Sequence, residues 1–177
     1  MKNLLNFIDW KDQDALLSIG CGAAWWEIKL MLQKPCRSLI LIDPNENVLN
    51  SEDLQEGIQY FENHYQKTLS TEIQFHNIDA KNSGLPSEQL DGILLFNSFH
   101  EIENPDQLLV ECFRILKPGG FILVEEELSH TSRKIHEGCE MPLFFEKELI
   151  QLFSEKGFHS VSRLEKDELA AYFRFVK

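Results

Sequence analysis

The 177-residue sequence has few cysteines, few basic side chains and no long apolar run. Its 17 lysines and arginines stand against 29 acidic side chains, which gives a net charge of −12. Binding to a phosphate backbone depends on basic side chains that neutralise phosphates, so this balance argues against a nucleic-acid partner. No run approaches the roughly 18 apolar residues that a membrane helix needs, and the N-terminal segment becomes charged before a signal-peptide core could form. We therefore expect a cytoplasmic protein without a membrane partner.

The cysteines show no disulfide or metal-binding pattern. They form no CxxC pair, which is the commonest sequence sign of a zinc or redox site. Only Cys139 has histidines close in sequence, His130 and His136, and this spacing matches no ligand set that we can justify physically. We expect reduced thiols and no bound metal. The four cysteines are Cys21, Cys36, Cys112 and Cys139.

Five short apolar runs predict the strands of a central sheet. Each run is nearly continuous rather than alternating, which is typical of parallel strands whose two faces are covered by helices. The stretches between the runs have helical spacing. Asn104 and Pro105 mark the start of one helix, which we expect to end at Pro118-Gly119-Gly120. The predicted strands are Ala15–Ile19, Ser38–Ile42, Ile73–Ile78, Gly92–Phe96 and Phe121–Val124.

This alternation of strands and helices predicts a doubly wound α/β fold. After Val124 the order changes: a polar stretch at 125–142 leads to a helix at 145–156, which Gly157 ends. Two alternating segments, 158–164 and 171–176, then suit a terminal antiparallel hairpin. No repeat or linker divides the chain. We expect a single domain over residues 1–177, built on a mostly parallel seven-stranded sheet.

The strand that ends at Ile19 leads into a glycine turn and then a helix. Gly20 and Gly22 allow the backbone to pass close to a ligand, and the free N–H groups at the helix start suit a nucleotide-like cofactor. Asp43 follows the next strand, where a carboxylate can accept both hydroxyl hydrogens of a ribose. The alternative for Asp43 is a turn residue before Pro44. The two features together favour cofactor binding.

Two later strand ends are expected to reach the same crevice. Asp79 follows the third predicted strand and could accept a hydrogen bond from the amine of adenine, although aspartate there is otherwise a turn former. Asn97, Ser98 and His100 follow the fourth strand. Ligands of doubly wound sheets lie beyond the carboxyl ends of the strands, so these three residues would line the same crevice.

The sequence resembles the small, single-domain type of class I S-adenosylmethionine-dependent methyltransferases from Ala15 to Lys177. The motifs that carry the resemblance are LLSIGCGAA, LILIDPN, IQFHNIDAKNSGLP and LDGILLFNSFHEIENPDQLLVECFRILKPGGFILVEEE. The RILKPGG turn in the last motif is the most specific. The resemblance implies a Rossmann-like fold, S-adenosyl-L-methionine as the cofactor, and an enzyme that transfers a methyl group to a small-molecule acceptor.

The resemblance also implies a role for each strand end. The glycine turn would approach the methionine part of the cofactor, and the second strand end would hold the ribose hydroxyls. The third would meet the adenine, and the fourth would lie near the sulfonium. In this order, the implied cofactor-binding residues are Ser18, Gly20, Cys21 and Gly22, then Asp43 and Pro44, then Asp79 and Ala80, and finally Asn97 and Ser98.

Two residues depart from the family pattern. Ser18 stands where most relatives carry an acidic residue and cannot balance the ammonium charge of the cofactor, so this task would fall to another residue or the affinity would be reduced. Ala24 replaces the third glycine, which we expect to cost little because the helix has begun there. A catalytically degenerate binding or regulatory protein is therefore an alternative. An NAD-dependent oxidoreductase is less favoured, because its glycine pattern requires glycine where Trp25 stands.

Methyl transfer mainly requires in-line positioning of the acceptor. His100 is the candidate base or orienting residue, with an ordinary polar loop residue as the alternative. We expect the acidic run at 125–127 to be solvated and the stretch at 125–142 to act as a lid.

Two apolar segments on either side of the first predicted strand are also expected to pack near the cofactor or the core. Residues 1–14 should pack as a short helix over the cofactor. Of Trp25 and Trp26, we expect at least one to pack into the core, while the other can lie towards the crevice or a partner.

Overall fold

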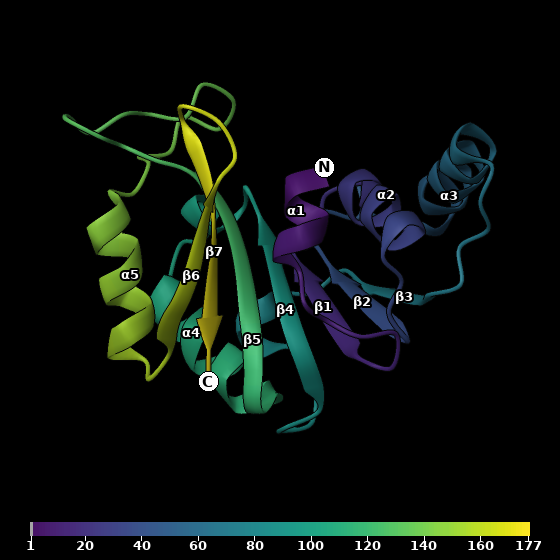
Figure 1. The fold of residues 1–177 in the computed structure, drawn as a ribbon, viewed down its shortest axis with the longest axis horizontal. Helices are drawn as coiled ribbons and strands as arrows, with labels where there is room; N and C mark the ends of the chain where they lie inside the picture. Colours follow the sequence, from purple (N-terminus) through teal and green to yellow (C-terminus); the bar gives the residue numbers. More distant parts are fainter. Residues whose placement is uncertain (1) are drawn as a thin grey trace.

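A seven-stranded sheet with helices on both faces organises the computed structural model, which describes residues 2–177 (Figure 1). The strand order is β3-β2-β1-β4-β5-β7-β6. The first five of these strands are parallel, and β7 is antiparallel to both β5 and β6. The predicted doubly wound sheet with its C-terminal hairpin is thereby confirmed. The strands are β1 (Ala15–Ile19), β2 (Ser38–Ile42), β3 (Glu72–His76), β4 (Leu90–Phe96), β5 (Leu116–Glu127), β6 (His159–Glu165) and β7 (Ala170–Val176).

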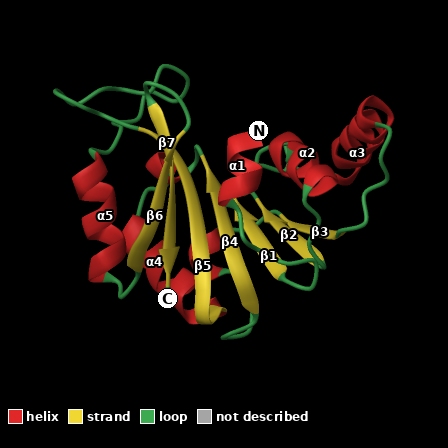
Figure 2. Ribbon diagram, viewed as in Figure 1, coloured by secondary structure: helices red, strands yellow, loops and turns green. Residues whose placement is uncertain are grey.

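The helices divide between the two faces of the sheet (Figure 2). Leu17 on β1 points into one apolar core, together with residues of α4 and α5. Its neighbour Leu16 points into the other core, together with residues of α1, α2 and α3. Burial on both faces explains why the sequences of β1, β2 and β4 are nearly continuously apolar,. The edge strand β3 instead alternates exposed and half-buried residues, contrary to our expectation of a strand buried on both faces. The helices are α1 (Lys2–Phe7), α2 (Trp25–Gln33), α3 (Ser51–Tyr65), α4 (Pro105–Ile115) and α5 (Glu146–Glu155), with short 3₁₀ turns η1 (Ala80–Asn82) and η2 (Phe99–Glu101).

Helix α4 begins as predicted but ends earlier. The side chain of Asn104 caps it by accepting a hydrogen bond from the backbone N–H of Gln107 (3.2 Å). The helix ends at Ile115, and Leu116 is already extended and paired with β4. A residue that precedes proline avoids the helical region, so Lys117 before Pro118 favours this earlier end. The glycines that we expected to end the helix lie inside β5 instead.

The N-terminal helix packs into the apolar core on the α2 face of the sheet. Leu4, Ile8 and Trp10 are buried among the residues of the α2 face of the sheet. The Trp10 ring stacks on Phe121 of β5, with ring centroids 6.4 Å apart. These apolar side chains complete the core, and the role of the segment as a cover for the cofactor stays a prediction.

No helix within residues 2–177 is long and apolar enough to cross a membrane.

Candidate functional site

The carboxyl ends of four strands are joined by short hydrogen bonds. The backbone N–H of Gly20, after β1, donates to the carbonyl of Ile42 on β2 (2.8 Å). The hydroxyl of Ser98, after β4, donates to the carbonyl of Ile19 (2.9 Å). The N–H of Asn97 donates to the carbonyl of Glu125 on β5 (2.8 Å). These bonds hold the four strand ends together at one edge of the sheet.

The glycine turn after β1 is shaped by left-handed backbone conformations. Gly20 has φ +68°, and a Cβ built there would lie only 2.6 Å from the Cβ of Ser98. Gly22 has φ +52°. Ala24 also has a left-handed φ of 57°, just before the first helical residue, Trp25. Our expectation that the helix has begun at Ala24 is wrong: its methyl group occupies a conformation that favours glycine.

Asp43 fixes the turn to the end of β2. Its half-buried carboxylate accepts hydrogen bonds from the backbone N–H groups of Gly22 and Asn45, both at 2.9 Å. The side chain of Asn77, in the loop after β3, donates to the carbonyl of Asp43 (3.2 Å). This hydrogen bond connects the loop after β3 to the end of β2. This explains why β3 ends at His76, two residues earlier than predicted. Each oxygen of Asp43 retains a lone pair that could accept a ribose hydroxyl.

Two cavities flank the turn, and Gly20 lines both of them. One, of about 220 Å³, lies at the ends of β1, β2 and β3. The other, of about 300 Å³, lies between α2 and the ends of β4 and β5. The first is lined by Ile19, Gly20, Ile42, Pro44, Asp79, Ala80, Lys81, Glu101, Ile102, Glu103 and Leu108. The second is lined by Gly20, Cys21, Trp26, Glu27, Phe96, Asn97, Glu125 and Lys166.

Six of the predicted site residues therefore line one crevice: Gly20, Cys21, Pro44, Asp79, Ala80 and Asn97. The other five, Ser18, Gly22, Asp43, Ser98 and His100, line neither cavity. Ser18 is fully buried beneath the turn, and the hydroxyl of Ser98 already donates its hydrogen bond to the carbonyl of Ile19. The carboxylate of Asp79 also accepts the N–H of Lys81 (2.9 Å), as a turn aspartate does.

Glu27 is the main residue that the sequence interpretation missed. It lies in the first turn of α2, is 2% exposed, and accepts a hydrogen bond from the hydroxyl of Ser18 (2.7 Å). Burial raises the pKa of Glu27 to about 7, the Ser18 hydrogen bond opposes this shift, and the negative charges of Glu125 and Asp43 add to it. A buried carboxyl without a cationic partner is costly. Its position suits a ligand that brings a positive charge.

Two residues that line the same cavity each have a buried polar atom without a hydrogen-bond partner. The indole Nε1 of Trp26 and the side-chain Oδ1 of Asn97 are both buried and unpaired. Asn97 also has a left-handed φ of 50°, which turns the chain at the end of β4. Unpaired buried polar atoms are rare in folded proteins and often mark a place where a ligand binds. The indole offers a donor, and the amide oxygen offers an acceptor.

The tryptophans at the start of α2 have different environments. Trp25 is 57% exposed and contacts Phe61 edge-on. Trp26 is half-buried, packs edge-on against Phe96 of β4 and lines the cavity. Trp26 thus serves both the core and the crevice, and Trp25 faces outwards.

The acidic run at the end of β5 is buried, contrary to our expectation. Glu125 is 5% exposed and pairs with Lys166 (2.5 Å) at the rim of the cavity. Glu126 is fully buried and accepts a hydrogen bond from the N–H of Phe99 (2.7 Å). The run is not solvated because β5 lies between β4 and β7 in the sheet.

His100 lies on η2 with its side chain fully buried. Its Nδ1 is 2.6 Å from Oε2 of Glu126. Burial disfavours the charged ring, but the hydrogen bond and the charge of Glu126 outweigh burial and raise the pKa of His100. The ring contacts His136 in the segment 128–145, with centroids 4.7 Å apart. This segment follows β5 and contains most of the predicted lid.

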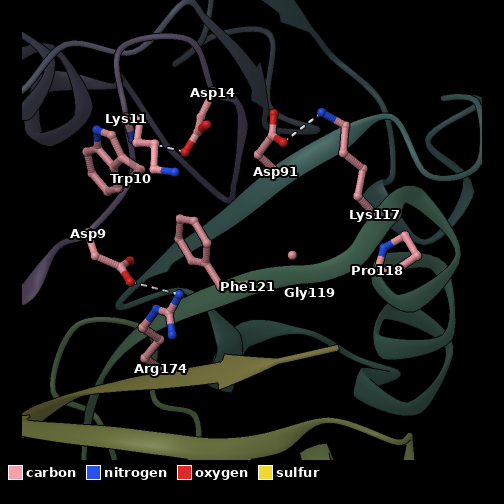
Figure 3. A pocket seen from close by; sticks show the side chains of 11 residues that line it. Asp9, Trp10, Lys11, Asp14, Asp91, Lys117, Pro118, Gly119, Phe121 and Arg174 are labelled. Carbon is pink, nitrogen blue, oxygen red and sulfur yellow. Dashed lines mark hydrogen bonds and ion pairs between the residues drawn. The ribbon is translucent and has the colours of Figure 1, made fainter.

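Another cavity, of about 260 Å³, lies at the opposite edge of the sheet, where β4 and β5 begin (Figure 3). Four of its six charged side chains form ion pairs: Lys117 with Asp91 (2.6 Å) and Arg174 with Asp9 (3.1 Å). Ligands of doubly wound sheets bind at the carboxyl edge. The crevice around Gly20 is therefore the candidate functional site.

The strand order defines a Rossmann-like α/β protein, and the crevice lies at the sheet edge where such folds bind their ligands,. A model of the methyltransferase domain family matches residues 17–124, more than half of the chain. The chain therefore belongs to the methyltransferase domain family, as the sequence motifs indicated. Solved structures of class I S-adenosylmethionine-dependent methyltransferases share its fold.

Three relatives illustrate the comparison. The biotin biosynthesis bifunctional protein BioHC of Teredinibacter turnerae is 24% identical over 173 residues, which cover 91% of this chain but only 29% of that protein. An S-adenosylmethionine-dependent methyltransferase from Methanosarcina mazei is 16% identical, with a TM-score of 0.74 over 100% of this chain and 97% of that chain. The 1,6-didemethyltoxoflavin-N1-methyltransferase of Burkholderia thailandensis, solved with its substrate and S-adenosylhomocysteine, is 16% identical, with a TM-score of 0.70 over 93% and 71%.

Proposed function

We propose that the crevice around Gly20 binds S-adenosyl-L-methionine and that the chain transfers its methyl group to a small-molecule acceptor. The observation that carries the proposal is that Glu27, whose carboxyl is buried, lines one cavity with Trp26 and Asn97, each of which has a buried polar atom without a partner. These three groups complement an amino acid, which has both an ammonium and a carboxylate. Family membership supplies the reaction class.

The two cavities divide the cofactor between them. Glu27 would hold the ammonium group and Trp26 would donate to the carboxylate, both beside the glycine turn. Asp43 would accept the ribose hydroxyls, and the cavity lined by Asp79 and Ala80 would take the adenine. In this arrangement Glu27 performs the task that Ser18 cannot. Ser18 instead orients Glu27 through its hydrogen bond, which removes the main reason to regard the protein as degenerate.

The chain's own residues would mainly position the acceptor. When bound, the sulfonium of the cofactor supplies a methyl group that is open to nucleophilic attack. Asn97 lies at the rim of the cavity with Glu125 and Lys166, where an acceptor would enter. The thiol of Cys21 is not a candidate nucleophile, because burial and the nearby Glu27 and Asp43 raise its pKa. No residue of α1 lines either cavity, so few elements would surround the acceptor, which favours a small molecule.

Binding is tested by tryptophan fluorescence, to which Trp26 in the cavity contributes, and by calorimetry with S-adenosylmethionine and S-adenosylhomocysteine. We expect quenching with either ligand and none with NAD. Glu27→Gln keeps the shape of the carboxyl but removes its charge, so we expect affinity to fall roughly 10- to 100-fold, as for loss of a charged hydrogen bond. The matched control is Glu52→Gln on the exposed face of α3, which should bind like the wild type.

Transfer is tested separately, with labelled methyl groups and a pool of metabolites. Labelling that disappears in Asp43→Ala would support an enzyme acting on a small molecule. Binding without transfer to any small molecule would overturn the enzymatic part of the proposal and favour a binding protein. Equal affinity of Glu27→Gln and wild type would overturn the role of Glu27.

A further inference from the structure

Four potential metal ligands from two distant segments meet beside the cofactor crevice. His100 and Glu101 belong to η2, and His136 and Cys139 belong to the segment 128–145. One nitrogen, oxygen or sulfur atom from each side chain lies within 4.8 Å of the others. Ligand atoms around a tetrahedral zinc ion lie about 3.3–3.8 Å apart, as the usual bond lengths of 2.0–2.3 Å require. Small rotations of the side chains would bring the four groups to these distances.

The buried ring of His100 provides an independent sign of a ligand. Its Nε2 is buried and has no hydrogen-bond partner. Its Nδ1 is bound to the fully buried carboxylate of Glu126 (2.6 Å). A carboxylate at Nδ1 holds the proton on that nitrogen and leaves the lone pair of Nε2 free, which is the usual arrangement behind a metal-binding histidine. Nε2 lies 3.8 Å from Oε1 of Glu101, so it faces the cluster.

The other two ligands are positioned by a tight loop. The N–H of His136 donates to the carbonyl of Met141 (2.8 Å), and the N–H of Glu140 donates to the carbonyl of His136 (3.0 Å). This loop brings Nδ1 of His136 to 3.1 Å from Sγ of Cys139. Both side chains are half-buried, so solvent can deliver an ion.

We propose that His100, Glu101, His136 and Cys139 form a zinc site that fastens the segment 128–145 to η2. Two imidazoles, a thiolate and a carboxylate suit Zn²⁺ better than Mg²⁺ or Ca²⁺, which prefer oxygen ligands. With four protein ligands the site is structural rather than catalytic. Glu101 also lines the cavity of Asp79 and Ala80, so the ion would stiffen one wall of the crevice. The proposal does not depend on methyl transfer.

The full chain, purified without a histidine tag and stripped with a chelator, is titrated with Co²⁺ and with Zn²⁺. We expect one equivalent of Co²⁺ to give the visible bands of a tetrahedral site and a near-ultraviolet thiolate-to-cobalt band. Zn²⁺ should displace it and raise Tm. Cys139→Ser should abolish the thiolate band, and His136→Gln should lower Zn²⁺ affinity at least ~100-fold, more than the 10- to 100-fold typical of groups behind the ligands.

His130→Gln is the matched control, because His130 is exposed in the same segment and lies outside the cluster. It should bind Zn²⁺ like the wild type. Both cluster variants alter half-buried side chains, and circular dichroism of the metal-free proteins would confirm that they fold. Co²⁺ spectra without a thiolate band, or equal Zn²⁺ affinity in His136→Gln, His130→Gln and wild type, would overturn the proposal.

Discussion

At the scale of single residues, Gly20 combines a left-handed backbone with a close approach to a neighbouring side chain. Its φ is left-handed, and an added Cβ would clash with the side chain of Ser98, so a substitution meets both a backbone cost and a steric cost. We expect Gly20→Ala to lower the free energy of unfolding by about 2–5 kcal/mol, the sum of the backbone cost and the cost of overpacking. Denaturant unfolding measures this.

Gly84 is the matched control, because it has the same φ of +68° but no atom within 4 Å of an added Cβ. Gly84→Ala should cost only about 1–2 kcal/mol, from the backbone alone. Equal losses in the two variants would show that the contact with Ser98 contributes nothing.

The sequence indicated which strand ends meet at one edge of the sheet, but it did not reveal the buried acid Glu27. Parallel strands place their carboxyl ends at one edge, so Gly20, Asp79 and Asn97 could be expected to meet. Glu27 was missed because the family pattern carries its acidic residue at the Ser18 position, within the strand. A signal was present: Glu27 falls at helical spacing from the buried Leu30 and Met31, where an apolar residue is normal,.

At the scale of elements, the segment 128–145 has no regular secondary structure and depends on a few side-chain contacts. Arg133 makes two hydrogen bonds to Glu148 of α5 (2.8 and 2.7 Å) and a third to the carbonyl of Leu143 (3.0 Å). Lysine cannot reproduce this planar, bidentate pairing. The arginine therefore ties the segment to the helix that follows it.

We expect Arg133→Lys to speed hydrogen exchange within 128–145 roughly fivefold, which corresponds to about 1 kcal/mol of local stability. Exchange in α3 should not change, because the loss is local. Arg163→Lys is the control, since Arg163 makes one 3.2 Å hydrogen bond to Glu146 on the same helix. Equal protection of the segment in wild type and Arg133→Lys would contradict this role.

Element types followed from the sequence, but the ends of elements and the N-terminal helix did not. The continuous apolar runs could only be strands buried on both faces, and Asn104 with Pro105 gave the start of α4. The amphipathic residues near the N-terminus were expected over the cofactor, and the structure shows them filling the core beside Phe121. Sequence periodicity shows that a helix has an apolar face but does not show which surface that face covers.

At the scale of the whole molecule, ionisation of Glu27 lowers the free energy of unfolding but would favour binding of a cationic ligand. Its pKa is about 7 in the folded chain and 4.5 in the reference state. Between these values the folded state holds more protons than the unfolded state, so stability falls as pH rises from 4.5 through 7. At 1.36 kcal/mol per unit, this single group costs roughly 3 kcal/mol at pH 8 relative to pH 4. A cationic ligand that pairs with the ionised carboxylate would recover part of this free energy.

Glu27→Gln should therefore be more stable than the wild type at pH 8, by roughly 2–3 kcal/mol, and nearly equal to it at pH 5, because glutamine keeps the Ser18 hydrogen bond without a charge. Unfolding curves at several pH values measure this. Adding S-adenosylmethionine should narrow the gap at pH 8, since the cation stabilises only the chain that carries the carboxylate. Stability curves of the two proteins that run parallel from pH 5 to pH 8 would contradict the raised pKa. A gap at pH 8 that the ligand leaves unchanged would show instead that Glu27 ionises without meeting the ammonium group, so the two results separate the buried charge from its proposed role.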